Sequence, residues 1–322
     1  MSNYADSWLK FEEGVGTRPI LSGTPEEMRT AHAGLMSALK PQYPPNPVSV
    51  TVQEGAHDTF GYRVYRPSGS NDGPLLPVGI YYHPGGLVVG PSIADEYFCS
   101  AVADKNQTVI VAISYRLSPE HKAPAHIEDA LKGVEWVSKN AATFGGDASK
   151  IYVVGVSAGG GLSVSVTRKI LLGQTPLDPK TIKGVAAFCP VLLHPDNIPS
   201  NYKSLHRSSV DNKTNTPIVD GESLRLFIGL AGQRPDDPDY FPALDGDSHK
   251  SFPPTYLVDC EMDSLRDDVT VFEASLRAAG VSVKSDSYSG LPHCFWIVPY
   301  FPETETFMEQ SYTGIQWVID QI

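Results

Sequence analysis

Short apolar runs recur along the chain and are separated by stretches in which apolar residues follow helical spacing. The runs most typical of buried strands lie at 78–82, 108–115, 151–156, 184–191, 255–260 and 283–289. Helical spacing covers 127–140 and 269–279, and Gly280 is placed to end the second of these helices. Repeated alternation of strand and helix predicts an α/β fold, with a mostly parallel central sheet flanked by helices on both faces.

Three segments depart from this alternation. Residues 48–53 and 60–65 predict an antiparallel hairpin at the edge of the sheet. Residues 1 to about 45 include a helix start, because Thr24 and Glu27 form a capping box around Pro25. Residues from about 193 to 232 are polar and irregular until a short helical run near their end. We expect one α/β domain over 1–322, with a cap formed from about 1–45 and about 193–232.

Composition and charge narrow the classes of partner. The chain has 322 residues, 41% of them hydrophobic, and a formal net charge of -12, which disfavours nucleic acid and anionic membrane surfaces as partners. No apolar run approaches the length of a membrane span, and the first residues lack a basic stretch followed by an apolar core. We therefore expect a soluble, cytoplasmic protein. Whether it forms a homodimer stays open.

The cysteines favour neither a disulfide framework nor a metal site. Cys99, Cys189, Cys260 and Cys294 are far apart in sequence, with no C-x-x-C pair and no His/Cys cluster at metal-ligand spacing. We expect buried thiols in a reducing compartment, and neither a metal nor a cofactor.

One serine lies in a pattern typical of a nucleophile. The pentapeptide 155–159, Gly-Val-Ser-Ala-Gly, directly follows a predicted strand and leads into an apolar helix. Strand, tight turn and helix are the setting of a nucleophile elbow, in which flanking glycines allow a strained serine backbone and close packing. We predict Ser157 as a nucleophile. The alternative is a glycine-rich loop that only packs a helix against a strand.

A serine hydroxyl needs a base to take its proton and an acid to orient that base. Of His206, His249 and His293, which follow Ser157, only His293 sits in a short loop directly after a predicted strand. This position places it at the same sheet edge as Ser157, so we predict His293 as the base. A purely structural role is the alternative for a lone histidine.

The acid must be chosen from the stretch VDCEMDSLRDD. Asp259 lies inside a predicted strand, and Asp267 and Asp268 are placed to cap the helix that follows. Asp263 falls in the turn just beyond the strand end. We therefore predict Asp263 as the acid and keep Glu261 as the alternative.

The oxyanion of a tetrahedral intermediate needs backbone N–H donors fixed in advance. In an elbow the first comes from the residue after the nucleophile, here Ala158, and the others come from an earlier glycine loop. The stretch YYHPGGLVVG follows the predicted strand 78–82, and Gly85 and Gly86 allow close approach to a substrate carbonyl. An ordinary Pro-Gly turn is the alternative for this loop.

These motifs together resemble the hormone-sensitive-lipase-like esterases of the α/β-hydrolase fold, including fungal members. HPGG stands where that family has His-Gly-Gly-Gly, and SYRLSPEH, GVSAGG, DSLRDD and GLPHCFW match its other motifs in order. The resemblance covers about residues 78–297 and implies a triad of Ser157, Asp263 and His293. It also implies an oxyanion hole of Gly85, Gly86 and Ala158, and a helical cap. The sequence departs from the family at Pro84, Val156 and Cys294. We expect Pro84 to stiffen the loop without removing a donor, Val156 to remove a polar contact, and the side chain of Cys294 to narrow the pocket.

We therefore expect a metal-free serine carboxylesterase that hydrolyses small to medium esters through an acyl-enzyme, in the manner of family members that serve secondary metabolism. Its expected partner is a small-molecule ester. Two alternatives stay open. The same triad could serve non-hydrolytic acyl transfer, lactonisation or cyclisation, or the chain could be a catalytically inactive, ligand-binding relative.

Overall fold

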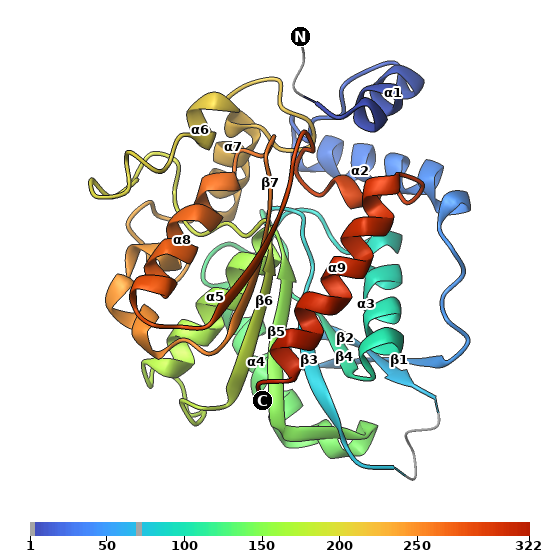
Figure 1. Cartoon of the computed structure of the whole chain (residues 1–322), viewed down its shortest axis with the longest axis vertical. Coiled ribbons are helices and arrows are strands. Elements are labelled where there is room, and N and C mark those ends of the chain that lie inside the picture. Colours follow the sequence, from blue (N-terminus) through green and yellow to red (C-terminus); the bar gives the residue numbers. More distant parts are fainter. Residues whose placement is uncertain (1–3, 69–72) are drawn as a thin grey trace.

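The computed structural model describes residues 4–68 and 73–322 and is built around an eight-stranded sheet (Figure 1). In spatial order the strands are β1 (Val50–His57), β2 (Phe60–Pro67), β4 (Val109–Ser114), β3 (Leu76–Tyr82), β5 (Gly146–Val156), β6 (Ile182–Phe188), β7 (Thr255–Cys260) and β8 (Val283–Tyr288). β2 pairs antiparallel with β1 and β4, and every other neighbouring pair is parallel. The predicted edge hairpin and mostly parallel sheet are confirmed.

Long helices cover both faces of the sheet, as Figure 1 shows. α3 (Ile93–Asn106) and α9 (Pro302–Ile319) pack together on one face, and α4 (Ala125–Asn140), α5 (Ala158–Leu171) and α8 (Arg266–Ala278) lie on the other. Aromatic rings fill the layer under α3 and α9, where Phe188 of the sheet contacts Phe98 and Phe307 at centroid distances of 5.5 and 5.8 Å. This buried layer holds the sheet rigid beneath its loops.

Most of the predicted helices and strands begin and end within a few residues of their predicted bounds. Gly280 follows the last residues of α8 with φ of 80°, the left-handed conformation that ends a helix. β6 ends at Phe188 rather than at 191, because Cys189 has φ of 45° and turns the chain out of the sheet. β5 begins at Gly146, earlier than predicted. All four cysteines are buried free thiols, as expected.

Two segments far apart in sequence meet above the carboxyl ends of the strands. The first contains α1 (Asp6–Val15) and α2 (Pro25–Leu39), and the second contains α6 (Ser208–Asp211) and α7 (Gly221–Ala231), all at the top of Figure 1. The N–H of Leu21 donates to the carbonyl of Ile218 at 2.9 Å, and the N–H of Ile218 donates to the carbonyl of Pro19 at 2.7 Å. The predicted capping box at Thr24 starts α2. The two segments therefore form one layer.

Short 3₁₀ turns complete the chain. They are η1 (Lys40–Gln42), η2 (Ala141–Phe144), η3 (Pro242–Leu244), η4 (Gly246–Ser251) and η5 (Phe295–Ile297). None of the described helices combines the length and the apolar character that crossing a membrane requires.

The carboxylates at the start of α8 bind the second segment instead of capping their own helix, which corrects the sequence-based expectation. Asp267 accepts hydrogen bonds from the N–H groups of residues 207 and 208, at 2.6 and 2.7 Å. Asp268 accepts from the N–H groups of residues 192 and 193, at 2.8 and 2.9 Å. Both lie inside the first turn of α8, so their carboxylates face across to the segment packed against it.

A buried histidine also binds one of these two carboxylates. His206 Nε2 lies 2.7 Å from Asp268 Oδ1, and both side chains are almost fully buried. Burial lowers the pKa of His206, but the Asp268 carboxylate raises it by more, so the net pKa lies above the usual 6.5. Such a group adds stability that is fully present below the unfolded pKa, and this stability is lost as pH rises through the folded pKa.

His206→Asn should therefore lower the free energy of unfolding more at pH 6 than at pH 9, because the ion pair exists only while His206 is protonated. Urea titrations at the two pH values measure the difference. The same change at the exposed His121 is the control. Equal losses for His206→Asn at both pH values would contradict the ion pair.

Candidate active site

Ser157 occupies a strained turn between β5 and α5. Its φ of 56° and ψ of −121° lie outside the regions that serines ordinarily adopt. A Cβ at residue 155 would lie 2.1 Å from the carbonyl oxygen of Gly159, and a Cβ at residue 159 would lie 2.0 Å from the carbonyl oxygen of Tyr82. Glycine is thus required on both sides of Ser157, as the elbow prediction assumes.

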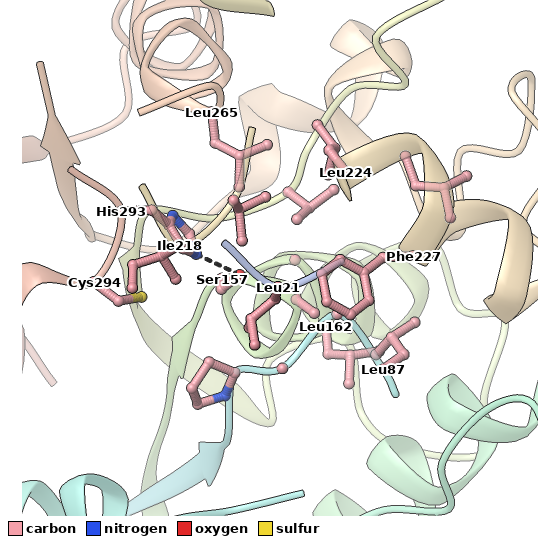
Figure 2. A pocket seen from close by; sticks show the side chains of 18 of the residues that line it. Leu21, Leu87, Ser157, Leu162, Ile218, Leu224, Phe227, Leu265, His293 and Cys294 are labelled. Atoms are coloured by element: carbon pink, nitrogen blue, oxygen red, sulfur yellow. Dashed lines mark hydrogen bonds between the residues drawn. The ribbon is translucent and has the colours of Figure 1, made fainter. Parts of the chain in front are cut away.

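A continuous hydrogen-bonded chain runs through three side chains from three loops (Figure 2 shows its first bond). Ser157 Oγ lies 2.9 Å from His293 Nε2, and His293 Nδ1 lies 2.6 Å from Asp263 Oδ2. All three residues are buried. This is the geometry in which Nδ1–H donates to the carboxylate, leaving Nε2 to accept the serine proton.

The structure separates Asp263 from the other carboxylates of its segment. Asp263 Oδ1 also accepts the N–H of Leu265 at 2.9 Å, which fixes the carboxylate plane. Glu261, the alternative acid, instead accepts the N–H of Gly290 at 2.8 Å. Asp259 accepts a hydrogen bond from Ser287. Of these three acids, only Asp263 hydrogen-bonds His293.

Burial and charge act in opposite directions on His293. Burial lowers its pKa, but the Asp263 carboxylate and its hydrogen bond raise it by more, so the net pKa lies well above the usual value. A neutral imidazole is the form that can accept a proton from Ser157. Activity should accordingly rise as pH increases through this raised pKa.

Two cysteines, Cys189 and Cys294, lie near His293. The donor atoms of Cys189, Asp263 and His293 lie within 4.8 Å of one another, and burial raises the pKa of the Cys294 thiol to about 11. Sequence spacing could not reveal this grouping, because its three members come from separate strand ends. The Nδ1–H of His293 is already engaged with Asp263, so the set contains a hydrogen-bonded pair with the Cys189 thiol beside it.

The glycine loop is shaped to present backbone donors. Gly85 and Gly86 have φ of 112° and 61°, and a Cβ on Gly86 would lie 2.4 Å from the ring of Phe227. Among the described residues, no carbonyl or side chain accepts from the N–H of either glycine. Tyr115 Oη donates to the carbonyl of His83 at 2.7 Å and its ring stacks on the imidazole, which holds the start of the loop.

A mostly apolar pocket contains Ser157, His293 and the three predicted oxyanion residues, Gly85, Gly86 and Ala158. Leucine, isoleucine and phenylalanine side chains from both segments above the sheet form much of its wall, as Figure 2 shows: Leu21, Ile218, Leu224 and Phe227. Cys294 also borders the pocket, with φ of 52°, a conformation that favours glycine. Its side chain takes up space beside His293.

The sequence of this chain was compared with protein families and with known proteins. A family model described as an alpha/beta hydrolase fold matches residues 79–297. The chain belongs to this family. It is 44% identical to the versiconal hemiacetal acetate esterase of Dothistroma septosporum, over 99% of this chain and 96% of that protein. It is 31% identical to carboxylesterase NlhH of Mycobacterium tuberculosis, over 72% of this chain and 69% of that protein.

Solved structures of other α/β hydrolases share the fold. Vibralactone cyclase superposes with a TM-score of 0.87 at 26% identity, covering 99% of this chain and 96% of that one. An esterase from Pyrobaculum calidifontis superposes with a TM-score of 0.81 at 24% identity and 98% coverage of both chains. The predicted fold and the predicted resemblance to esterases of this family are confirmed.

Asp263→Asn should reduce kcat on a nitrophenyl ester by about 10⁴, because the amide would donate to Nδ1 and leave the proton on Nε2. Loss of the carboxylate also removes what raises the pKa of His293, so the remaining activity should reach its plateau at lower pH. A pH–rate profile measures both effects. Glu261→Gln is the matched control, and a larger loss in that variant would assign the acid to Glu261.

Proposed function

We propose that this chain is a serine carboxylesterase in which Ser157 is the nucleophile, His293 the general base and Asp263 the residue that orients it. The observation that carries the proposal is the unbroken hydrogen-bonded chain from Ser157 through His293 to Asp263, placed in an apolar pocket. The esterases among the relatives support the same reaction.

The geometry supports a two-step reaction. Ser157 Oγ attacks the ester carbonyl while its proton passes to His293 Nε2. His293 then gives that proton to the departing alkoxide, and an acyl group remains on Ser157. A water molecule repeats the sequence, with its proton taken by His293, and releases the carboxylic acid.

The backbone N–H groups of Gly85, Gly86 and Ala158 are the proposed oxyanion hole. Ala158 opens α5, so its N–H also lies at the positive end of the helix dipole. Pro84 has no N–H to donate, but it stands one position before the two proposed donors and its carbonyl accepts His83 Nδ1–H at 2.7 Å. The proline therefore stiffens the loop without removing a proposed donor.

We also propose that about 1–45 and about 193–232 act as a cap on a single 1–322 domain. Two observations support this: the backbone pairing of Leu21 with Ile218, and the presence of both side chains in the pocket wall. A mostly apolar wall beside Ser157 favours small to medium organic esters.

The relative from Dothistroma is named for an acetate ester, which supports a small-molecule substrate and a role in secondary metabolism. A cytoplasmic location is part of the proposal and is supported by four free, buried thiols. A homodimer stays a prediction, for which the test is the mass measured by light scattering.

A second candidate is cyclisation or lactonisation by the same triad. The superposition on vibralactone cyclase at a TM-score of 0.87 favours it. Hydrolysis and cyclisation differ only in whether water or a hydroxyl of the acyl chain attacks the acyl-enzyme, so analysis of the products distinguishes them. An inactive ligand-binding protein is disfavoured, because Ser157, His293 and Asp263 are joined as catalysis requires.

The decisive test combines labelling with turnover. A fluorophosphonate should add one covalent group to the intact protein at Ser157, and Ser157→Ala should not be labelled. The same variant should lose about a millionfold in kcat on nitrophenyl acetate, because the nucleophile and its base act as a unit. Mass spectrometry and nitrophenol release measure the two outcomes.

Ser163→Ala is the matched control, because Ser163 lies in the same helix and donates to the carbonyl of Gly159 instead of to the triad. Full activity of Ser157→Ala would refute the mechanism. Labelling of Ser157 without turnover of any nitrophenyl ester would favour the cyclase candidate.

A further inference from the structure

One hydroxyl in the pocket wall has no hydrogen-bond partner in the part of the chain that the structure describes. Ser165, on α5, is 1% exposed and borders the active-site pocket, and its Oγ has no hydrogen-bond partner among the described residues. A serine or threonine hydroxyl inside a helix can donate to the carbonyl four residues earlier when it does not face solvent. Ser163 does so at 3.1 Å and Thr167 at 2.7 Å, whereas Ser165 makes no such bond.

Buried polar atoms without partners are uncommon, because leaving them unpaired destabilises the folded state. Other such atoms occur in the described part of the chain, on Ser7, His83, Ser100, Asn106, His206, Tyr288, Glu303 and Ser311. None of these residues borders the pocket around Ser157, whereas Ser165 does. A ligand in that pocket is therefore a natural partner for the Ser165 hydroxyl.

Helix geometry sets how far Ser165 lies from the reacting carbonyl. Ala158, Leu162 and Ser165 fall on one face of α5 and all border the pocket. Ser165 comes seven residues after Ala158, which is about 10 Å along the axis at 1.5 Å per residue. A group bound there must extend well beyond an acetyl unit.

The side of the pocket identifies which part of the ester reaches Ser165. Figure 2 shows His293 and Cys294 on one side of Ser157, and Leu162 and Phe227 on the opposite side. The alcohol must leave beside His293, which supplies its proton. An acyl chain on the opposite side would extend past Leu162 along α5, toward Ser165.

We propose that the Ser165 hydroxyl determines specificity by hydrogen-bonding a polar oxygen on the acyl chain of the substrate. This inference rests on the proposed esterase function. The span along α5 places that oxygen about six bonds from the ester carbonyl. Gln233 and Tyr240 also border the pocket, so an oxygen-bearing chain would not meet a wholly apolar wall.

The test compares the nitrophenyl esters of 6-hydroxyhexanoic acid and heptanoic acid, which differ only in a terminal hydroxyl or methyl group. We expect Ser165→Ala to lower the ratio of kcat/KM for the hydroxy ester to that for the heptanoate by about five- to tenfold, the value of one hydrogen bond. The change should come mainly from KM of the hydroxy ester, with kcat on heptanoate retained.

Two further variants separate lost bonding from lost packing. Ser165→Cys fills nearly the same space with a weak hydrogen-bonding group and should shift the ratio as Ser165→Ala does. Ser163→Ala removes a hydroxyl from the same helix, where it is bonded to a backbone carbonyl, and should leave the ratio unchanged.

The outcomes distinguish this inference from the proposed function. If wild type hydrolyses both esters and Ser165→Ala leaves the ratio of their kcat/KM values unchanged, Ser165 does not bind the acyl chain. The inference about Ser165 then fails, while the proposed esterase function stands. If wild type hydrolyses neither these esters nor nitrophenyl acetate, the esterase function itself fails. The same comparison can be made with the hydroxyl on the alcohol side, using the monoacetate of 1,6-hexanediol and heptyl acetate. If Ser165→Ala changes the kcat/KM ratio only for this second pair, Ser165 binds the alcohol and the proposed placement of the acyl chain is wrong.

Discussion

The close approach of backbone segments around Ser157 is the constraint on which the site depends. Gly155 and Gly159 have no room for a Cβ, since one would meet a neighbouring carbonyl oxygen at 2.1 or 2.0 Å. This close approach allows α5 to begin directly after β5, with Ser157 between them at a φ of 56°. The strain costs on the order of 1–3 kcal/mol, and the burial of the surrounding sheet and helices offsets it. In return, the hydroxyl is held toward His293 instead of back toward its own helix.

The layer above the sheet is tied to the acid turn as well as to the pocket. Asp267 and Asp268 accept four backbone N–H groups from residues 192–193 and 207–208. Asn212 donates to the backbone carbonyl of Asp263 at 3.0 Å. Each contact couples the segment that lines the pocket to α8 or to the turn that carries Asp263, the proposed acid. Movement of that segment would therefore change both the pocket wall and the position of Asp263.

The sequence predicted what depends on local pattern. The approximate strand positions, the elbow at Ser157 and the loop position of His293 follow from apolar periodicity and glycine spacing, and the motif order indicated the family. Contacts between distant segments could not be read in this way. The pairing of Leu21 with Ile218 and the unpartnered Ser165 depend on how separate segments pack in three dimensions. The prediction that Asp267 and Asp268 cap α8 was wrong for the same reason. Their position at the start of the helix does not indicate which segment packs against them.

The five carboxylates near the end of β7 differ in their hydrogen-bond partners, and these partners depend on how the chain packs around them. Asp259, Glu261, Asp263, Asp267 and Asp268 lie within ten residues of one another. Burial raises the pKa of Asp259 to about 6, and Ser287 is its partner, whereas the carboxylates at 261, 267 and 268 accept backbone N–H groups. Each of these carboxylates is therefore bound by a group other than the imidazole of His293. Of these five carboxylates, only Asp263 hydrogen-bonds His293, so the surrounding hydrogen bonds, more than the residue type, support it as the proposed acid.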